Sequence, residues 1–182
     1  MGLNISVMTH FNEKAPIPDS YWLIPESLLA GEYPGSFDKT ELQRKVKAFL
    51  AAGVTFFVDL TEDGELKPYA PTLTEEAKIL GVPIIHRRFG VKDGGIPSIE
   101  TMRNILDTIA AAISDGHIVY FHCYGGIGRT GTVAGCWLVE QGMTPEEALT
   151  KLSILRKDCP DGRITSPEND TQARFVEKWK VS

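Results

Sequence analysis

One ten-residue segment, 122–131, constrains the fold of this 182-residue chain more than any other part of its sequence. It reads His-Cys-Tyr-Gly-Gly-Ile-Gly-Arg-Thr-Gly and separates Cys123 from Arg129 by a glycine-rich loop. The apolar run 118–121 before it predicts a strand, and the stretch 130–141 after it predicts a helix. A strand, a tight loop and a helix start, in that order, form a pocket for an anion.

The loop residues between the cysteine and the arginine form the predicted substrate-binding site. Its glycines permit backbone angles that other residues resist, and they let amide groups approach a bound oxyanion closely. The start of the following helix adds partial positive charge. These loop residues are Tyr124, Gly125, Gly126, Ile127 and Gly128.

The segment matches the pattern H-C-x5-R-[ST]-G, and through it the chain resembles the cysteine-dependent protein tyrosine and dual-specificity phosphatases. Upstream, the segment 93–97 (Asp-Gly-Gly-Ile-Pro) is similar to the D-G-G-x-P acid loop of the cyclin-dependent-kinase-associated phosphatase group, which also reads H-C-Y-G-G-x-G-R. The segment 63–69 is similar to that group's G-E-L-x-x-Y. The resemblance covers residues 54–158 and implies a metal-independent phosphatase that hydrolyses phosphate monoesters.

Chemistry assigns a role to each polar residue of the segment. Cys123 is the predicted nucleophile, which forms a cysteinyl-phosphate that water then hydrolyses; a helix N-terminus favours its thiolate. The planar fork of Arg129 would bind two phosphate oxygens at once. The Thr130 hydroxyl would assist departure of the sulfur, and it is also a candidate N-cap of the helix. We expect His122 to order the loop through backbone hydrogen bonds rather than to transfer protons.

A general acid must protonate the leaving oxygen, and the segment 122–131 contains no carboxylate. Asp93 is the predicted acid, because the resemblance places the family's acid there and two glycines follow it as a hinge. Asp59, at a predicted strand end, and Asp63, in a second Asp-Gly turn, are the competing candidates. A simple turn explains Asp93 equally well by composition alone.

The segment 166–172 (Ser-Pro-Glu-Asn-Asp-Thr-Gln) stands where related tyrosine phosphatases carry water-positioning glutamines. Gln172 fits the second glutamine, and the resemblance gives it a supporting role. Glu168 stands where the first glutamine might be expected. Helix capping explains Ser166 and Glu168 without catalysis, and we favour that interpretation.

The alternation of predicted strands and helices indicates an α/β fold, with a mainly parallel central sheet flanked by helices. The resemblance to the dual-specificity phosphatases implies their three-layer sandwich. We expect a flexible segment over 1–20 and a phosphatase domain over 21–182. The predicted strands are 22–24, 28–30, 54–60, 82–86 and 118–122, and the predicted helical segments are 38–53, 75–80, 98–116, 130–141, 144–155 and 166–179.

The charge, the cysteine spacing and the lengths of the apolar runs limit the partners, cofactors and locations that this chain can have. The net charge of −5, with no basic stripe, argues against nucleic acid. The three cysteines show no C-x-x-C spacing, which argues against a disulfide framework and a zinc site and favours a reducing, cytoplasmic location. No apolar run is long enough to span a membrane. We therefore expect a monomer with no cofactor, no metal and no stable membrane insertion.

The predicted substrate is a phosphorylated protein or a small phosphate monoester. The loop 124–128 contains no lysine or arginine, which favours a monophosphate over a polyphosphoinositide. The choice between phosphotyrosine and phosphoserine or phosphothreonine as substrate stays open, because it depends on the depth of the pocket, which the sequence does not show. Two alternatives also stay open: an inositol-phosphate or small-metabolite phosphatase with the same chemistry, and a non-catalytic module that binds phosphoproteins.

Overall fold

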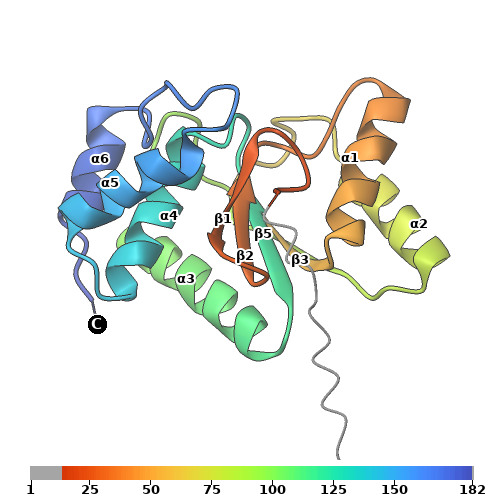
Figure 1. The fold of residues 1–182 in the computed structure, drawn as a ribbon, viewed down its shortest axis with the longest axis horizontal. Coiled ribbons are helices and arrows are strands. Elements are labelled where there is room, and N and C mark those ends of the chain that lie inside the picture. The colour runs from red at the N-terminus through yellow and green to blue at the C-terminus, as the bar shows by residue number, and fades with distance from the viewer. Residues whose placement is uncertain (1–13, 182) are drawn as a thin grey trace, which may run out of the picture.

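The computed structural model describes residues 14–181, which form an α/β fold of three layers (Figure 1). A five-stranded sheet in the order β1-β2-β5-β3-β4 lies between two groups of helices. The strands are β1 (Ser20–Ile24), β2 (Leu28–Gly31), β3 (Val54–Asp59), β4 (Ile85–Arg88) and β5 (Ile118–His122). The helices are α1 (Lys39–Ala51), α2 (Ala70–Leu80), α3 (Ile99–Ser114), α4 (Gly128–Glu140), α5 (Pro145–Arg156) and α6 (Asp170–Glu177).

The sheet aligns the ends of its parallel strands. Only β1 and β2 pair antiparallel within the described residues; β2–β5, β5–β3 and β3–β4 are parallel. His122, the last residue of β5, is in register with Gly31 of β2 and with Asp59 of β3. The chain therefore leaves three neighbouring strands at one edge, which is where α/β sheets bind ligands. The predicted, mainly parallel α/β sandwich is confirmed.

Apolar residues on both faces of the sheet produce two cores. Along β3, Phe56 and Val58 pack toward α3, α4, α5 and α6, whereas Phe57 packs toward α1 and α2. This follows from the two-residue period of a strand. Because helices cover both faces, the central strands β3 and β5 are apolar nearly throughout, as expected for parallel strands.

Three predicted element boundaries are wrong. The helix predicted at 75–80 begins at Ala70, since Pro71 lies in the first turn, where its missing N–H removes no hydrogen bond. The strand predicted at 82–86 is Ile85–Arg88, because pairing with the end of β3 sets its limits. The last helix begins at Asp170 rather than at Ser166.

The first described residues already belong to the fold. Ile17 is only 2% exposed and packs in the core beside α1, and β1 begins at Ser20. Of the segment predicted to be flexible, residues 1–13 lie outside the described residues. The domain boundary at residue 21 stays a prediction. Within 14–181, no helix has both the length and the apolar character that crossing a membrane requires.

Candidate active site

The glycine-rich loop leaves β5 at Cys123 and enters α4 at Gly128. Cys123 is 3% exposed. Gly126 has a φ of +69°, and a Cβ there would lie 2.4 Å from the carbonyl carbon of Gly31. Both facts require glycine, since the left-handed backbone and the contact with the end of β2 each exclude a side chain. The sheet edge thus determines the path of the loop.

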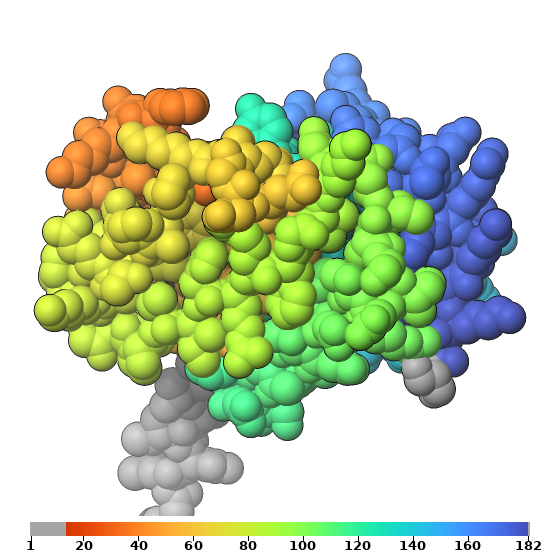
Figure 2. Space-filling view, turned by 180° about the vertical axis from the view of Figure 1, so that it is seen from behind, coloured from red at the N-terminus to blue at the C-terminus, as the bar shows by residue number. Residues whose placement is uncertain are grey.

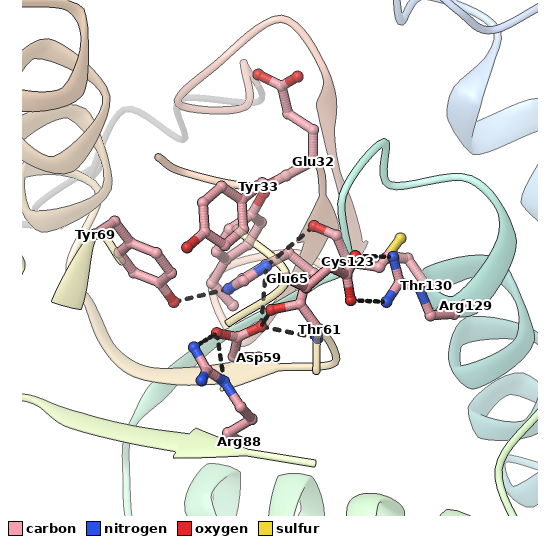
Figure 3. A network of polar contacts seen from close by, with 12 residues as sticks. Glu32, Tyr33, Asp59, Thr61, Glu65, Tyr69, Arg88, Cys123, Arg129 and Thr130 are labelled. Atoms are coloured by element: carbon pink, nitrogen blue, oxygen red, sulfur yellow. Dashed lines mark hydrogen bonds and ion pairs between the residues drawn. The ribbon is translucent and has the colours of Figure 1, made fainter. Parts of the chain in front are cut away.

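The guanidinium group of Arg129 is held by several partners, and Figure 3 shows its two contacts with Glu65. Its Nη1 donates to Glu65 Oε2 at 2.8 Å and to the Val91 carbonyl at 2.9 Å. Its Nη2 donates to Glu65 Oε1 at 2.7 Å and lies 2.8 Å from Asp93 Oδ1. Within the described residues its Nε–H has no acceptor. Two loops that precede Arg129 by many residues therefore set the orientation of the guanidinium.

The Glu65–Arg129 pair is bidentate and largely withdrawn from water. The side chains are 19% and 1% exposed, respectively. Hydrogen bonding to Arg129 lowers the pKa of Glu65 below its ordinary value, although partial burial opposes this. Burial alone lowers the pKa of Arg129, but the hydrogen bonds that it donates to Glu65 and the charge of Cys123 outweigh burial and raise that pKa. Both partners are thus charged over the physiological range.

Asp93 reaches the site from an exposed turn. Gly95 N–H donates to Lys92 O at 2.9 Å, and Gly94, at φ +67°, takes the left-handed position of that turn. The Asp93 side chain is 74% exposed, although its Oδ1 contacts Arg129. Asp93 therefore lies in a turn, and its side chain also contacts Arg129.

The two competing carboxylates lie elsewhere. Asp59 is fully buried and accepts hydrogen bonds from Thr61 and Arg88. Asp63 is fully exposed and pairs with Arg88 at 2.7 Å. Within residues 14–181, the ion pairs of Arg129 are with Glu65 and Asp93.

A buried polar network lies beneath the loop. His122 Nδ1 is 3.2 Å from Cys123 O, and its Nε2 is 2.7 Å from the Tyr69 hydroxyl. Burial lowers the pKa of His122 to about 4, so the ring is neutral at pH 7. Nδ1–H therefore donates to the backbone of Cys123, and Nε2 accepts from Tyr69. The ring thus contacts the backbone of the loop, and its role in ordering the loop stays a prediction.

Asp59 completes this network. Its Oδ1 lies 4.0 Å from His122 Nδ1. Burial raises the pKa of Asp59, but contacts with His86, His122 and Thr61 outweigh burial and hold that pKa well below its usual range. A charged carboxylate at the end of β3 thus lies beside His122, the residue that precedes the loop.

Three capping predictions, for Thr130, Ser166 and Glu168, are wrong. The N-cap of α4 is Ile127 rather than Thr130, because Gly131 N–H already bonds to Ile127 O at 3.1 Å. The Thr130 hydroxyl donates to Gly31 O at 3.4 Å. The Ser166 hydroxyl donates to Ile127 O at 2.7 Å, so it supports the loop instead of capping α6.

The cap of α6 is Asn169, whose Oδ1 accepts from Gln172 N–H at 3.0 Å. Gln172 itself is fully buried, and a Cβ at Gly128 would come within 2.9 Å of its Oε1. The exposed Glu168 caps nothing; its Oε2 would lie 3.0 Å from the same Cβ. The segment 168–172 therefore lies against Gly128, the residue at which the loop ends and α4 begins.

Sequence reasoning assigned no role to Glu65 or to Tyr69. Both belong to the segment 63–69, whose G-E-L-x-x-Y likeness was the one available signal.

Tyr124, the first loop residue, is 62% exposed. Within residues 14–181, no three His, Cys, Asp or Glu side chains cluster so as to hold a metal ion.

Comparison with known proteins identifies what this arrangement is similar to. The family model described as "Polymorphic toxin system, DSP-PTPase phosphatase" matches residues 35–143. Cyclin-dependent kinase inhibitor 3 of Homo sapiens is 28% identical over 121 residues, which are 65% of this chain and 56% of the relative. Protein tyrosine phosphatase domain-containing protein 1 of Mus musculus is 28% identical over 138 residues, which are 71% of this chain and 18% of the relative. The chain therefore spans less than two thirds of either relative.

Two solved structures share the fold. The active form of Tk-PTP superposes with a TM-score of 0.67 at 25% identity, covering 89% of this chain and 96% of that one. The kinase-associated phosphatase with its catalytic-site cysteine replaced by serine also has a TM-score of 0.67 at 25% identity, covering 83% and 84%.

Proposed function

Because the chain belongs to the DSP-PTPase phosphatase family, we propose that it hydrolyses phosphate monoesters through a cysteinyl-phosphate intermediate on Cys123. The observation that carries the proposal is the 2.8 Å contact between Asp93 and Arg129, beside the loop that begins at Cys123. This contact supports a site in which Asp93 is the acid, Arg129 binds the phosphate and Cys123 is the nucleophile.

Arg129 binds the phosphate through the edge of its guanidinium that carries Nε and Nη2. Nη1 is fully committed to Glu65 and Val91, whereas Nε–H has no acceptor among the described residues. One hydrogen of Nη2 is held by Asp93. An entering phosphate takes both positions of this edge and displaces the Asp93 carboxyl group toward the ester oxygen. The amides of residues 124–128 bind the remaining oxygens.

The Cys123 thiolate attacks phosphorus, the P–O ester bond breaks, and Asp93 transfers its proton to the departing oxygen. In the second step the Asp93 carboxylate takes a proton from water, which attacks phosphorus and releases the thiolate and inorganic phosphate. Thr130, next to Arg129, assists release of the sulfur. Gln172 positions the water; its buried Oε1, which lacks a donor among the described residues and lies against Gly128, supports this role.

The proposed substrates are phosphoproteins that carry phosphotyrosine, and phosphoserine or phosphothreonine as well. The uncharged loop 124–128 supports a monophosphate. We assign the activity to a cytoplasmic monomer that does not act on nucleic acid. The net charge of −5 and three free cysteines support this assignment.

The test compares wild type with Cys123→Ser on phosphotyrosine peptides, phosphothreonine peptides and inositol phosphates. Wild type should hydrolyse the peptides best, and the serine variant should bind inorganic phosphate without turnover. Best turnover of inositol phosphates would instead establish the small-metabolite alternative. Equal turnover by both proteins would exclude the cysteinyl-phosphate.

The assignment of the acid has its own test. Asp93→Asn should remove the basic limb of the kcat/KM–pH profile, because no proton then titrates on the acid. Retention of both limbs would assign the acid to another residue.

A further inference from the structure

The acid loop contacts the C-terminal helix through two side-chain amides. Asn169 Nδ2 donates to Gly94 O at 3.0 Å, and Gln172 Nε2 donates to Gly95 O at 3.0 Å. The two carbonyls belong to the residues that directly follow Asp93. In Figure 2, the lime-green segment near residue 93 meets the blue C-terminal part at the upper edge of the molecule. Hydrogen bonds thus hold the loop from outside its own segment.

Both donors are themselves held in place. Asn169 Oδ1 accepts from Gln172 N–H, so the two polar ends of this amide have different partners and its orientation is set. Gln172 is fully buried, and its amide lies against Gly128 as well as Gly95. Gln172 therefore joins the acid loop to the first residue of α4, next to Arg129.

The loop has few other contacts that could hold it. Val91 N–H bonds to Leu60 O, and Ser98 caps α3, so the loop is anchored at both ends. Between these anchors, two consecutive glycines give the backbone wide conformational freedom, and the Asp93 side chain is 74% exposed. Arg129 also contacts this loop, at Val91 O and at Asp93 Oδ1, but the contact with Asp93 must be given up when Asp93 turns to the ester oxygen.

We propose that Asn169 and Gln172 are positioning residues that latch the acid loop over the site, so that Asp93 reaches the leaving oxygen. The inference rests on the proposed phosphatase function and adds a role for α6 to it. Neither latch hydrogen bond needs to break when Asp93 exchanges Arg129 for the ester oxygen, because both involve backbone carbonyls. The latch therefore acts on the loop, and the Asp93 side chain is free to turn.

Substrate chemistry separates this role from general stabilisation. Phenyl phosphate has a poor leaving group that needs the acid, whereas 2,4-dinitrophenyl phosphate has a leaving group that departs without a proton. A variant with a loose acid loop should therefore lose kcat/KM on the first substrate and keep it on the second. This ratio covers only the steps up to release of the leaving group, so it excludes hydrolysis of the cysteinyl-phosphate, in which Asp93 also acts. Loss of protein stability alone lowers both rates by the same factor.

The main variant is Asn169→Asp, which keeps the oxygen that caps α6 and removes the donor to Gly94 O. Asn169→Ser repeats the test without adding charge, and it serves if the aspartate variant does not fold. Thr144→Ala, which removes the N-cap of α5, is the control for a lost cap remote from the loop. We expect each Asn169 variant to lower kcat/KM on phenyl phosphate about 10-fold and to change kcat/KM on the dinitrophenyl ester less than about 2-fold, since acid catalysis contributes roughly 10²- to 10⁴-fold.

A double-mutant cycle completes the test. In an Asp93→Asn background, Asn169→Ser should cause no further loss on phenyl phosphate, because the latch acts through Asp93. An equal loss on both substrates, no loss on either, or a loss that persists without Asp93 would overturn the latch. A wild type that releases no more phosphate than Cys123→Ser would instead overturn the proposed function, so the two failures are distinguishable.

Discussion

Replacement of Glu65 by glutamine tests whether the ion pair between Glu65 and Arg129 stabilises the protein and orients the guanidinium group. Glu65→Gln keeps the shape of the side chain but removes the charge, and it turns one oxygen that faces Arg129 into an NH2 group. One of the two hydrogen bonds between residue 65 and Arg129 is lost, because an N–H of the new amide then faces an N–H of the guanidinium group. Asp63→Asn is the matched control, because Asp63 lies on the same loop and pairs with an arginine at the same 2.7 Å but is fully exposed.

The structure sets the size of the expected effect. Removal of one partner from a buried ion pair costs about 3–5 kcal/mol. Glu65 keeps 19% of its side chain exposed, and Arg129 retains Asp93 and Val91 O. We therefore expect Glu65→Gln to lower the free energy of unfolding by about 2–3 kcal/mol at pH 7. Asp63→Asn should leave it unchanged within the error of a urea titration, because solvent screens an exposed pair.

The pH dependence follows from the lowered pKa of Glu65 in the folded protein. A carboxyl group with a depressed folded-state pKa contributes stability above its unfolded pKa of about 4.3, and that contribution is lost as the pH falls through the folded-state pKa. The difference between wild type and Glu65→Gln should therefore be complete above about pH 5 and shrink below about pH 4.

Urea unfolding at several pH values measures this difference, and hydrolysis of 4-nitrophenyl phosphate supplies the second readout. We expect kcat/KM of Glu65→Gln to fall about 10- to 100-fold, because a misplaced guanidinium no longer aligns the phosphate. A variant as stable as wild type at pH 7, or a difference that stays constant down to pH 3, would refute this account of the pair.

Two further predictions concern the loop and its support. Gly126→Ala should lower the free energy of unfolding by more than about 2 kcal/mol, because the φ of Gly126 is +69° and the new methyl group would overlap Gly31. Gly125→Ala is the control in the same denaturation series, since its methyl group would lie 3.7 Å from its nearest neighbour. Tyr69→Phe should cost about 1–3 kcal/mol, because it leaves Nε2 of the buried His122 without its donor, and a thermal melt that matches wild type would contradict this.

Much of the fold could be predicted because its signals are local. The apolar positions Leu42, Val46 and Phe49 fall on one helical face, and all three are buried. The capping box at Thr144 forms as its spacing predicts. The boundaries that were wrong depend on distant partners instead: β4 ends where β3 ends, and Ser166 bonds to Ile127 rather than to its own helix.

The sequence by itself determined the chemistry of the loop. Cys123, the glycines and Arg129 lie within ten consecutive residues, so the strand, turn and helix start that surround them follow from local rules. The position of the aligned strand ends follows from the alternation of strands and helices.

Only the tertiary structure decided which distant groups meet Arg129. Glu65 and Asp93 precede it by 64 and 36 residues, and spacing along a chain carries no information about contacts at that range. Packing against the acid loop likewise made Asn169 and Gln172 its partners. Such contacts arise because the chain returns repeatedly to one sheet edge, where side chains from separate loops share a single small volume.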